Sequence, residues 1–247
     1  MVWGVLSCAD RESSASRPLR ISVATEPSTV DPARASTVFE AYIINNLWIG
    51  LTRYDQGLEV AAGVAQMWSF NADATEITFR LREDARWSDG EPVTSYDFAY
   101  AWRRLLDPET AAEYAYFLYD IVNAEAINSG EMTPDELGVE TPDEHTLVVH
   151  LRRPVVYFPH LTTFMVTMPV RQDLVERYGE RWTRPENLVT NGAYTLSEWR
   201  HDYRLTLSAS PHPLDEAPAI ESIEVYTINS SSTALALYQS GHLDVVL

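Results

Sequence analysis

Three stretches of the sequence alternate apolar and polar residues with the two-residue period of a half-buried strand. They are residues 19–25, 76–84 and 145–151. The second is the most regular, because Ile77, Phe79 and Leu81 lie on one predicted face. In the first stretch the apolar face carries Leu19, Ile21 and Val23, and Arg20, Ser22 and Ala24 fall on the other face.

Two stretches instead repeat apolar residues at helical spacing. Residues 36–51 form the first predicted helix, and Gly50 stands near its expected end. The second begins after Thr94, a predicted N-cap with Asp97 three residues on, and Asp107 and Pro108 end it. Its predicted buried stripe consists of Phe98, Ala101, Trp102 and Leu105.

In the last third of the sequence, the residue pattern predicts a short helix around residues 173–179, a hairpin over 194–207 and a strand over 220–228. A further helix over 232–240 is expected to stop at Gly241, and residues 242–247 begin another strand. Strands and helices are thus mixed along the whole chain. This mixture predicts an α/β or α+β architecture.

The composition is that of a folded globular protein, with 45% hydrophobic and 11% aromatic residues in 247. The net charge of -18 argues against a nucleic-acid partner, which would need clustered cations. The pairs Arg103-Arg104 and Arg152-Arg153 are isolated and typical of solvated faces. Because the chain contains no lysine, every lysine-dependent mechanism is excluded.

Cys8 is the only cysteine, so the chain can form no internal disulfide. It follows the apolar start MVWGVLS and precedes a polar stretch, as in the lipidation site of a bacterial lipoprotein signal. The apolar run is short and lacks a basic region before it. Two interpretations therefore stay open, a truncated lipoprotein signal and an apolar start by chance.

The sequence shows no pattern that catalysis or metal binding would need. It has no G-x-S-x-G turn, no H-E-x-x-H motif and no glycine-rich phosphate loop. His145 and His150, five residues apart on a predicted strand, fall on opposite faces and are expected to be structural. We therefore expect no catalytic residue, no metal and no cofactor, although pairs of carboxylates leave acid-base catalysis open.

Four blocks of the sequence carry a family resemblance. In order they read FRLREDARWSDGEPVTSYDFAYAWRRLLDP, LGVETPDEHTLVVHLRRPVVYF, RYGERWTRPENLVTNGAYTLSEW and LYQSGHLDVV. They resemble the extracytoplasmic oligopeptide-binding proteins of ABC importers, in the wider dipeptide, oligopeptide and nickel-binding receptor family. The similarity covers nearly the whole chain, and the blocks around WSDGEPVTSYDF and NLVTNGAY are the most specific.

The resemblance implies a mixed α/β fold, in which one lobe of the type II periplasmic-binding-protein kind carries an inserted α+β domain. Residues 1–18 would be a signal remnant or tether, residues 19–50 with 170–247 a discontinuous domain, and residues 51–169 the insertion. Family members continue into a second lobe, which we expect to be missing from this sequence. The two lobes would close on an oligopeptide held in extended form, and a membrane permease would receive it.

The resemblance also implies candidate ligand-binding residues. Glu40 lies at the spacing from Asp31 and Pro32 that places an acidic residue beside the peptide's amino end in the oligopeptide branch. The other interpretation is a carboxylate that stabilises a helix N-terminus. Ala41 and Tyr42 are expected to offer backbone groups.

Two aromatic residues complete the candidate site. Tyr114 matches a tyrosine that lines the family's cleft, although an aromatic that only packs on a helix would fit the same position. Phe164 stands where some relatives place a polar cleft residue, which changes the contacts expected there. Asn191 and Gly192 are expected to shape a turn.

The leading hypothesis is a monomeric, periplasmic solute-binding component, held by a lipid at Cys8 if the signal is real. Alone, this chain should bind peptide weakly or not at all. The alternatives are a receptor of the same fold for an oligosaccharide, a nickel chelate or an opine. A carboxylate-based hydrolase, a signalling receptor and a nonfunctional fragment also stay open.

Overall fold

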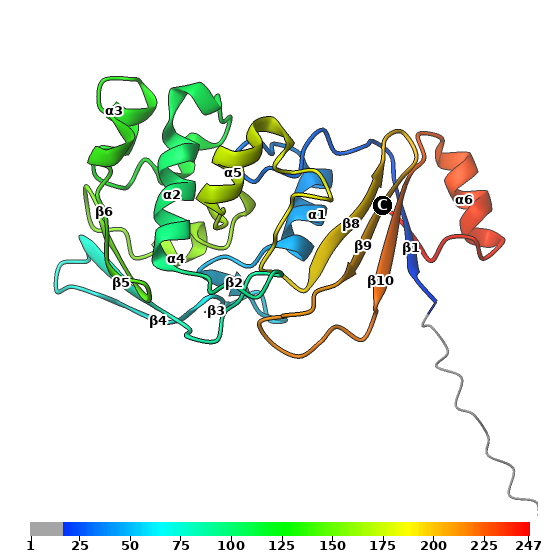
Figure 1. Cartoon of the computed structure of the whole chain (residues 1–247), viewed down its shortest axis with the longest axis horizontal. Helices are drawn as coiled ribbons and strands as arrows, with labels where there is room; N and C mark the ends of the chain where they lie inside the picture. Colours follow the sequence, from blue (N-terminus) through cyan, green and yellow to red (C-terminus); the bar gives the residue numbers. More distant parts are fainter. Residues whose placement is uncertain (1–16) are drawn as a thin grey trace, which may run out of the picture.

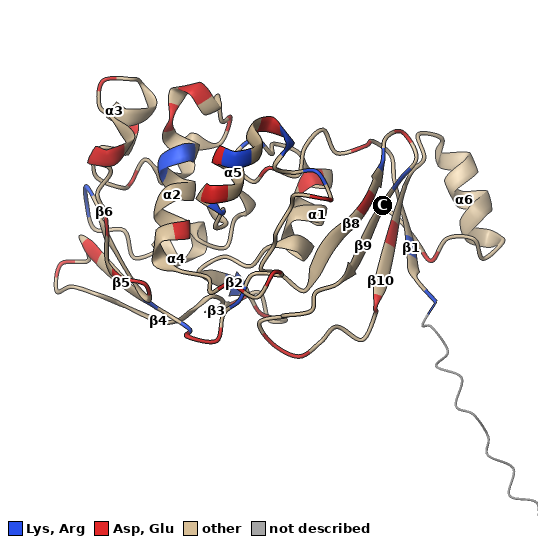
Figure 2. Ribbon diagram, in the orientation of Figure 1, with Lys and Arg blue, Asp and Glu red and all other residues tan. Residues whose placement is uncertain are grey.

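The structure is a computed structural model, and it describes residues 17–247 (Figure 1). The proposed lipidation site Cys8 therefore lies outside the described residues. Within residues 17–247, no helix is both long enough and apolar enough to cross a membrane. Acidic side chains outnumber basic ones and are spread over most of the molecule, whereas the helix at residues 231–239 carries none (Figure 2).

Strands from both ends of the chain form one five-stranded sheet, in the order β11-β1-β10-β9-β8. The strands are β1 (Leu19–Val23), β8 (Tyr194–Arg200), β9 (Arg204–Ala209), β10 (Ser222–Thr227) and β11 (Val245–Val246). β1 pairs in parallel with β10 and β11, whereas β9 is antiparallel to β8 and β10. Ser22 is buried because helices cover this sheet on both sides (Figure 1), and the prediction that its face of β1 is exposed is wrong.

The middle of the chain forms separate sheets. The four-stranded antiparallel sheet has the order β4-β5-β7-β6, and a small hairpin pairs β2 with β3. Their bounds are β2 (Thr52–Tyr54), β3 (Val60–Ala62), β4 (Ala65–Phe70), β5 (Glu76–Leu81), β6 (Val139–Asp143) and β7 (Thr146–His150). The alternation predicted for β5 and β7 is confirmed, since Ile77, Phe79, Leu147 and Val149 are fully buried.

Six α-helices accompany the sheets within the described residues: α1 (Val38–Leu47), α2 (Ser95–Leu106), α3 (Ala124–Asn128), α4 (Phe158–Leu161), α5 (Gln172–Tyr178) and α6 (Ser231–Gln239). Short 3-10 turns lie at η1 (Pro108–Thr110), η2 (Ala115–Leu118), η3 (Pro134–Glu136), η4 (Met165–Thr167) and η5 (Gly179–Arg181). α2 lies over the four-stranded sheet, and α1 and α6 lie on opposite sides of the five-stranded sheet (Figure 1).

The predicted N-terminus of α2 is confirmed. A carboxylate oxygen of Asp97 accepts the Thr94 N–H at 2.8 Å and the indole N–H of Trp87 at 3.3 Å. The buried stripe of α2 then meets α4, since the Trp102 ring lies edge-on to Phe98 and Phe158 with centroids 6.5 and 6.1 Å away. This aromatic packing holds α2 against α4.

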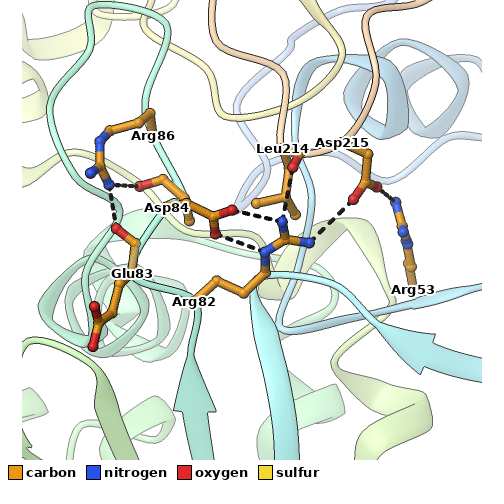
Figure 3. A network of polar contacts seen from close by, with 8 residues as sticks. Arg53, Arg82, Glu83, Asp84, Arg86, Leu214 and Asp215 are labelled. Carbon is orange, nitrogen blue, oxygen red and sulfur yellow. Dashed lines mark hydrogen bonds and ion pairs between the residues drawn. The ribbon is translucent and has the colours of Figure 1, made fainter.

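One connected cluster of buried residues runs through both sheet regions. Polar contacts join them as well. Asp215, in the loop between β9 and β10, accepts from Arg53 of β2 at 2.5 Å and from Arg82, just after β5, at 3.2 Å (Figure 3). Arg82 is also held by Asp84 through two bonds of 2.9 Å. We keep the division into residues 19–50 with 170–247 and residues 51–169 as a proposal.

Candidate functional site

The segment Ser36–Phe39, where α1 begins, is held from two sides. The Glu40 carboxylate accepts the N–H groups of Ser36 and Thr37 at 2.8 and 2.9 Å, which closes a capping box with Thr37. From the other side, the Tyr114 hydroxyl donates to the Ser36 carbonyl at 3.0 Å. The backbone of Ser36 is therefore bound at both its N–H and its C=O.

Glu40 makes two further contacts, so its carboxylate has no free oxygen. Its Oε1 accepts the N–H of Ser28 at 3.1 Å and the hydroxyl of Ser28 at 2.6 Å, and the residue is 1% exposed. Burial by itself raises the pKa of Glu40, but the hydrogen bonds from Ser28, Ser36 and Thr37 outweigh it and leave this pKa below its ordinary value. The carboxylate is charged and holds two loops together.

The geometry does not favour the prediction that Ala41 and Tyr42 offer backbone groups to a ligand, because these groups are engaged within the helix. The Ala41 N–H donates to the Thr37 carbonyl at 3.0 Å, and the Tyr42 carbonyl accepts from the Asn46 side chain at 2.7 Å. Both residues lie inside α1, where main-chain groups bond within the helix. Only the ring of Tyr42, 45% exposed, is open to a ligand.

Tyr114 and Phe164, which are 50 residues apart, lie together. Their ring centroids are 5.7 Å apart, in an edge-on arrangement. Phe117 of η2 stacks on Phe164 at 4.3 Å, and Tyr116 lies edge-on to Tyr114 at 5.9 Å. The structure thus brings the predicted aromatic residues together beside Ser36.

The loop that leads into this segment is anchored to α2 by an ion pair that the sequence did not reveal. Arg104 donates to both oxygens of the buried Asp31, at 2.8 and 2.5 Å. The prediction that the pair Arg103-Arg104 is a solvated face is therefore wrong for Arg104. A bidentate pair of this kind fixes both distance and orientation.

The two most specific sequence blocks contact each other through Ser88 and Thr190. The Ser88 N–H donates to the Thr190 carbonyl at 2.8 Å, and the Thr190 N–H donates to the Ser88 hydroxyl at 3.2 Å. Next to it, the Asn191 side chain accepts the Ile49 N–H at 3.1 Å and donates to the Ile49 carbonyl at 2.9 Å. Asn191 therefore clamps the chain after α1, which goes beyond the turn-shaping role predicted for it.

His150 lies beside two carboxylates. His150 lies in β7, with its Nε2 3.0 Å from a carboxylate oxygen of Glu140 and its Nδ1 3.5 Å from one of Glu76. Within residues 17–247, histidine, cysteine and carboxylate side chains nowhere gather in a group of three suited to a metal ion. His145 makes no part of such a group.

Comparison with known proteins identifies the class to which this fold belongs. A family model described as "Bacterial extracellular solute-binding proteins, family 5 Middle" matches residues 59–247. Since this match spans most of the chain, the chain belongs to the family 5 extracellular solute-binding proteins of bacteria.

Individual relatives agree with this family. The chain is 41% identical over 224 residues to the periplasmic oligopeptide-binding protein OppA of Escherichia coli, and 40% identical over 223 residues to its periplasmic murein peptide-binding protein MppA. These alignments cover 90% and 89% of this chain but 41% of either relative. The chain thus spans less than half the length of these relatives, which are binding proteins by name.

A solved structure shows the same fold. The crystal structure of Haemophilus influenzae OppA in complex with the peptide RPPGFSPFR superposes with a TM-score of 0.89 at 38% identity. It covers 92% of this chain and 45% of that one. The mixed α/β, periplasmic-binding-protein-like lobe implied by the sequence is confirmed.

Proposed function

We propose that this chain supplies one lobe of an extracytoplasmic receptor that captures oligopeptides and delivers them to the permease of an ABC importer. The observation that carries the proposal is the similarity, over about nine-tenths of the chain, to proteins named for peptide binding. The receptor would act as a monomer, without a nucleic-acid partner, and would hold its ligand without cleaving it. A lipid anchor at Cys8 remains part of this proposal.

The Ser36–Phe39 segment is the proposed contact with the peptide main chain. Added-strand binding needs main-chain groups that are free at the surface. Among the described residues, the N–H groups of Val38 and Phe39 have no hydrogen-bond acceptor, as is usual in the first turn of a helix. Val38 is also 62% exposed, so a carbonyl of an extended peptide can approach these donors.

Glu40 is proposed to act through the segment and not by contact with the ligand. Its oxygens are occupied by Ser28, Ser36 and Thr37, and its side chain is buried. A peptide ammonium would have to displace these bonds, each of which is a hydrogen bond to a charged acceptor. Glu40 and Tyr114 are thus positioning residues for the surface that faces the peptide.

Titration of the 247-residue chain with trialanine, followed by two-dimensional NMR, tests this proposal. We expect a dissociation constant in the millimolar range, because one lobe supplies only part of the contacts that close on a ligand. The amide signals of Val38 and Phe39 should move most. If a maltose oligosaccharide shifts these signals and trialanine at tens of millimolar does not, the peptide assignment is wrong.

A further inference from the structure

We propose that four aromatic residues beside the peptide contact form a specificity surface for peptides with an aromatic side chain. This aromatic surface consists of Tyr114, Tyr116, Phe117 and Phe164. The inference rests on the proposed function, since it names the class of peptide that the same site would prefer.

The rings of the aromatic surface contact one another in a continuous group. Phe117 and Phe164 are stacked nearly parallel, with centroids 4.3 Å apart and an interplanar angle of 2°. The Tyr114 ring is edge-on to both, at 5.7 Å. Tyr116 lies 5.1 Å from Phe117, so a further ring can extend the group by stacking or by an edge contact.

The aromatic surface is open on the side that a ligand would approach. Tyr116 is 55% exposed, and Phe117 and Phe164 are only partly buried. The Tyr114 hydroxyl donates to the Ser36 carbonyl at 3.0 Å, so the rings lie close to the segment that carries Val38. An extended peptide places its side chains alternately on two sides, and one of these sides would face the rings.

The chemistry of the rings favours an apolar aromatic occupant. Phe117 and Phe164 have no hydrogen-bonding group, and the Tyr114 hydroxyl already donates its hydrogen bond to the Ser36 carbonyl. Within residues 17–247, the arginine guanidinium groups that lie over aromatic rings contact Trp182, Tyr178 and Tyr203. None lies over a ring of the aromatic surface. No arginine therefore competes with a ligand for the exposed parts of these rings.

A lysine side chain is the competing occupant, because ring faces also attract cations. The phenylalanine pair offers an ammonium group no hydrogen-bond acceptor, however, so a lysine side chain that covers these rings loses part of its hydration without a replacement. An aromatic side chain incurs no such cost. We therefore assign the preference to aromatic peptides, and a lysine-containing peptide serves as the discriminating probe.

Saturation-transfer difference NMR on the 247-residue chain measures this preference with the tripeptides Ala-Ala-Ala, Ala-Phe-Ala and Ala-Lys-Ala. Ala-Phe-Ala should bind about three- to tenfold more tightly than Ala-Ala-Ala, the gain expected of one additional aromatic pair. The ratio of these two dissociation constants should fall toward one in the Phe164→Ala variant. The Tyr116→Ala variant, which removes an exposed ring, should lower the ratio without a risk to folding.

The Tyr238→Ala variant is the matched control, since it removes an equally exposed ring from α6. It should leave the ratio unchanged. Equal binding of all three peptides, or tighter binding of Ala-Lys-Ala, overturns the specificity inference and leaves peptide binding intact. Failure of every peptide to bind, Ala-Ala-Ala included, overturns the proposed function and the inference with it.

Discussion

Replacing Gly192 with alanine is expected to lower the free energy of unfolding by about 3 kcal/mol, at the upper end of the cost of overpacking. A Cβ atom at this position would lie 2.5 Å from the Leu47 carbonyl carbon and 2.7 Å from the Asn46 oxygen. Both neighbours are backbone atoms at the end of α1, so neither can move aside alone. The Gly192 N–H also donates to the Leu47 carbonyl at 2.8 Å, and the clash would stretch this bond.

Urea denaturation of the Gly192→Ala variant measures the effect. The control is Gly57→Ala, in an exposed turn where the added Cβ would meet only the flexible Asp55 side chain at 3.2 Å. This control should change stability by less than about 1 kcal/mol. Equal stability of the two variants would show that the NGAY block does not dock on α1 as closely as the structure places it.

The Glu40→Gln variant is expected to lose about 2 to 3 kcal/mol of stability at neutral pH. Glutamine keeps the shape of the side chain but replaces one acceptor oxygen with a donor NH₂ group. Since both oxygens accept backbone N–H groups, from Ser28 on one side and from Ser36 and Thr37 on the other, either orientation sets donor against donor. The exposed Glu113→Gln is the matched control and should be nearly neutral.

The loss of stability in the Glu40→Gln variant should depend on pH. Because the folded-state pKa of Glu40 is lowered, its contribution is present above the unfolded-state value and is lost as pH falls through the folded-state value. The stability difference between the wild type and Glu40→Gln should therefore shrink below about pH 4. Unchanged stability combined with lost peptide affinity would instead favour direct contact between Glu40 and the ligand.

Sequence patterns predicted the fold best for helices and strands whose structure depends on their own residues. The strand β5 and the capped start of α2 depend on local alternation and on the pair Thr94 and Asp97, and both are confirmed. The end of α6 before Gly241 is confirmed for the same reason, because Gly241 adopts a positive φ of 74°. Such signals need no knowledge of the rest of the chain.

Features set by distant contacts were missed. The first helix was expected to run to residue 51 but ends at Leu47, where Trp48 is already extended. The cause is 142 residues away, since the Asn191 side chain pairs with the backbone of Ile49 and holds it out of the helix. The strands β2 and β3 were not predicted, because three residues each are too few for a period to be read.

The candidate site also combines features that the sequence predicted with features that it did not. The family resemblance found Tyr114 and Phe164, and the structure brings them together. It also suggested Glu40, but the partners that bury this carboxylate, Ser28 above all, carry no sequence signal. The roles of all five predicted residues in ligand binding, Ala41 and Tyr42 included, remain proposals.

The central claim is that an extended peptide lies along Ser36–Phe39 beside the aromatic surface. The most direct measurement is photo-cross-linking of the 247-residue chain with an alanine tripeptide that carries benzoylphenylalanine at its centre, mapped by mass spectrometry. The account predicts cross-links at Val38, Tyr116 or Phe164 that excess Ala-Phe-Ala suppresses. Suppressible cross-links confined to another face, such as α6 or the β9-β10 loop, would contradict it.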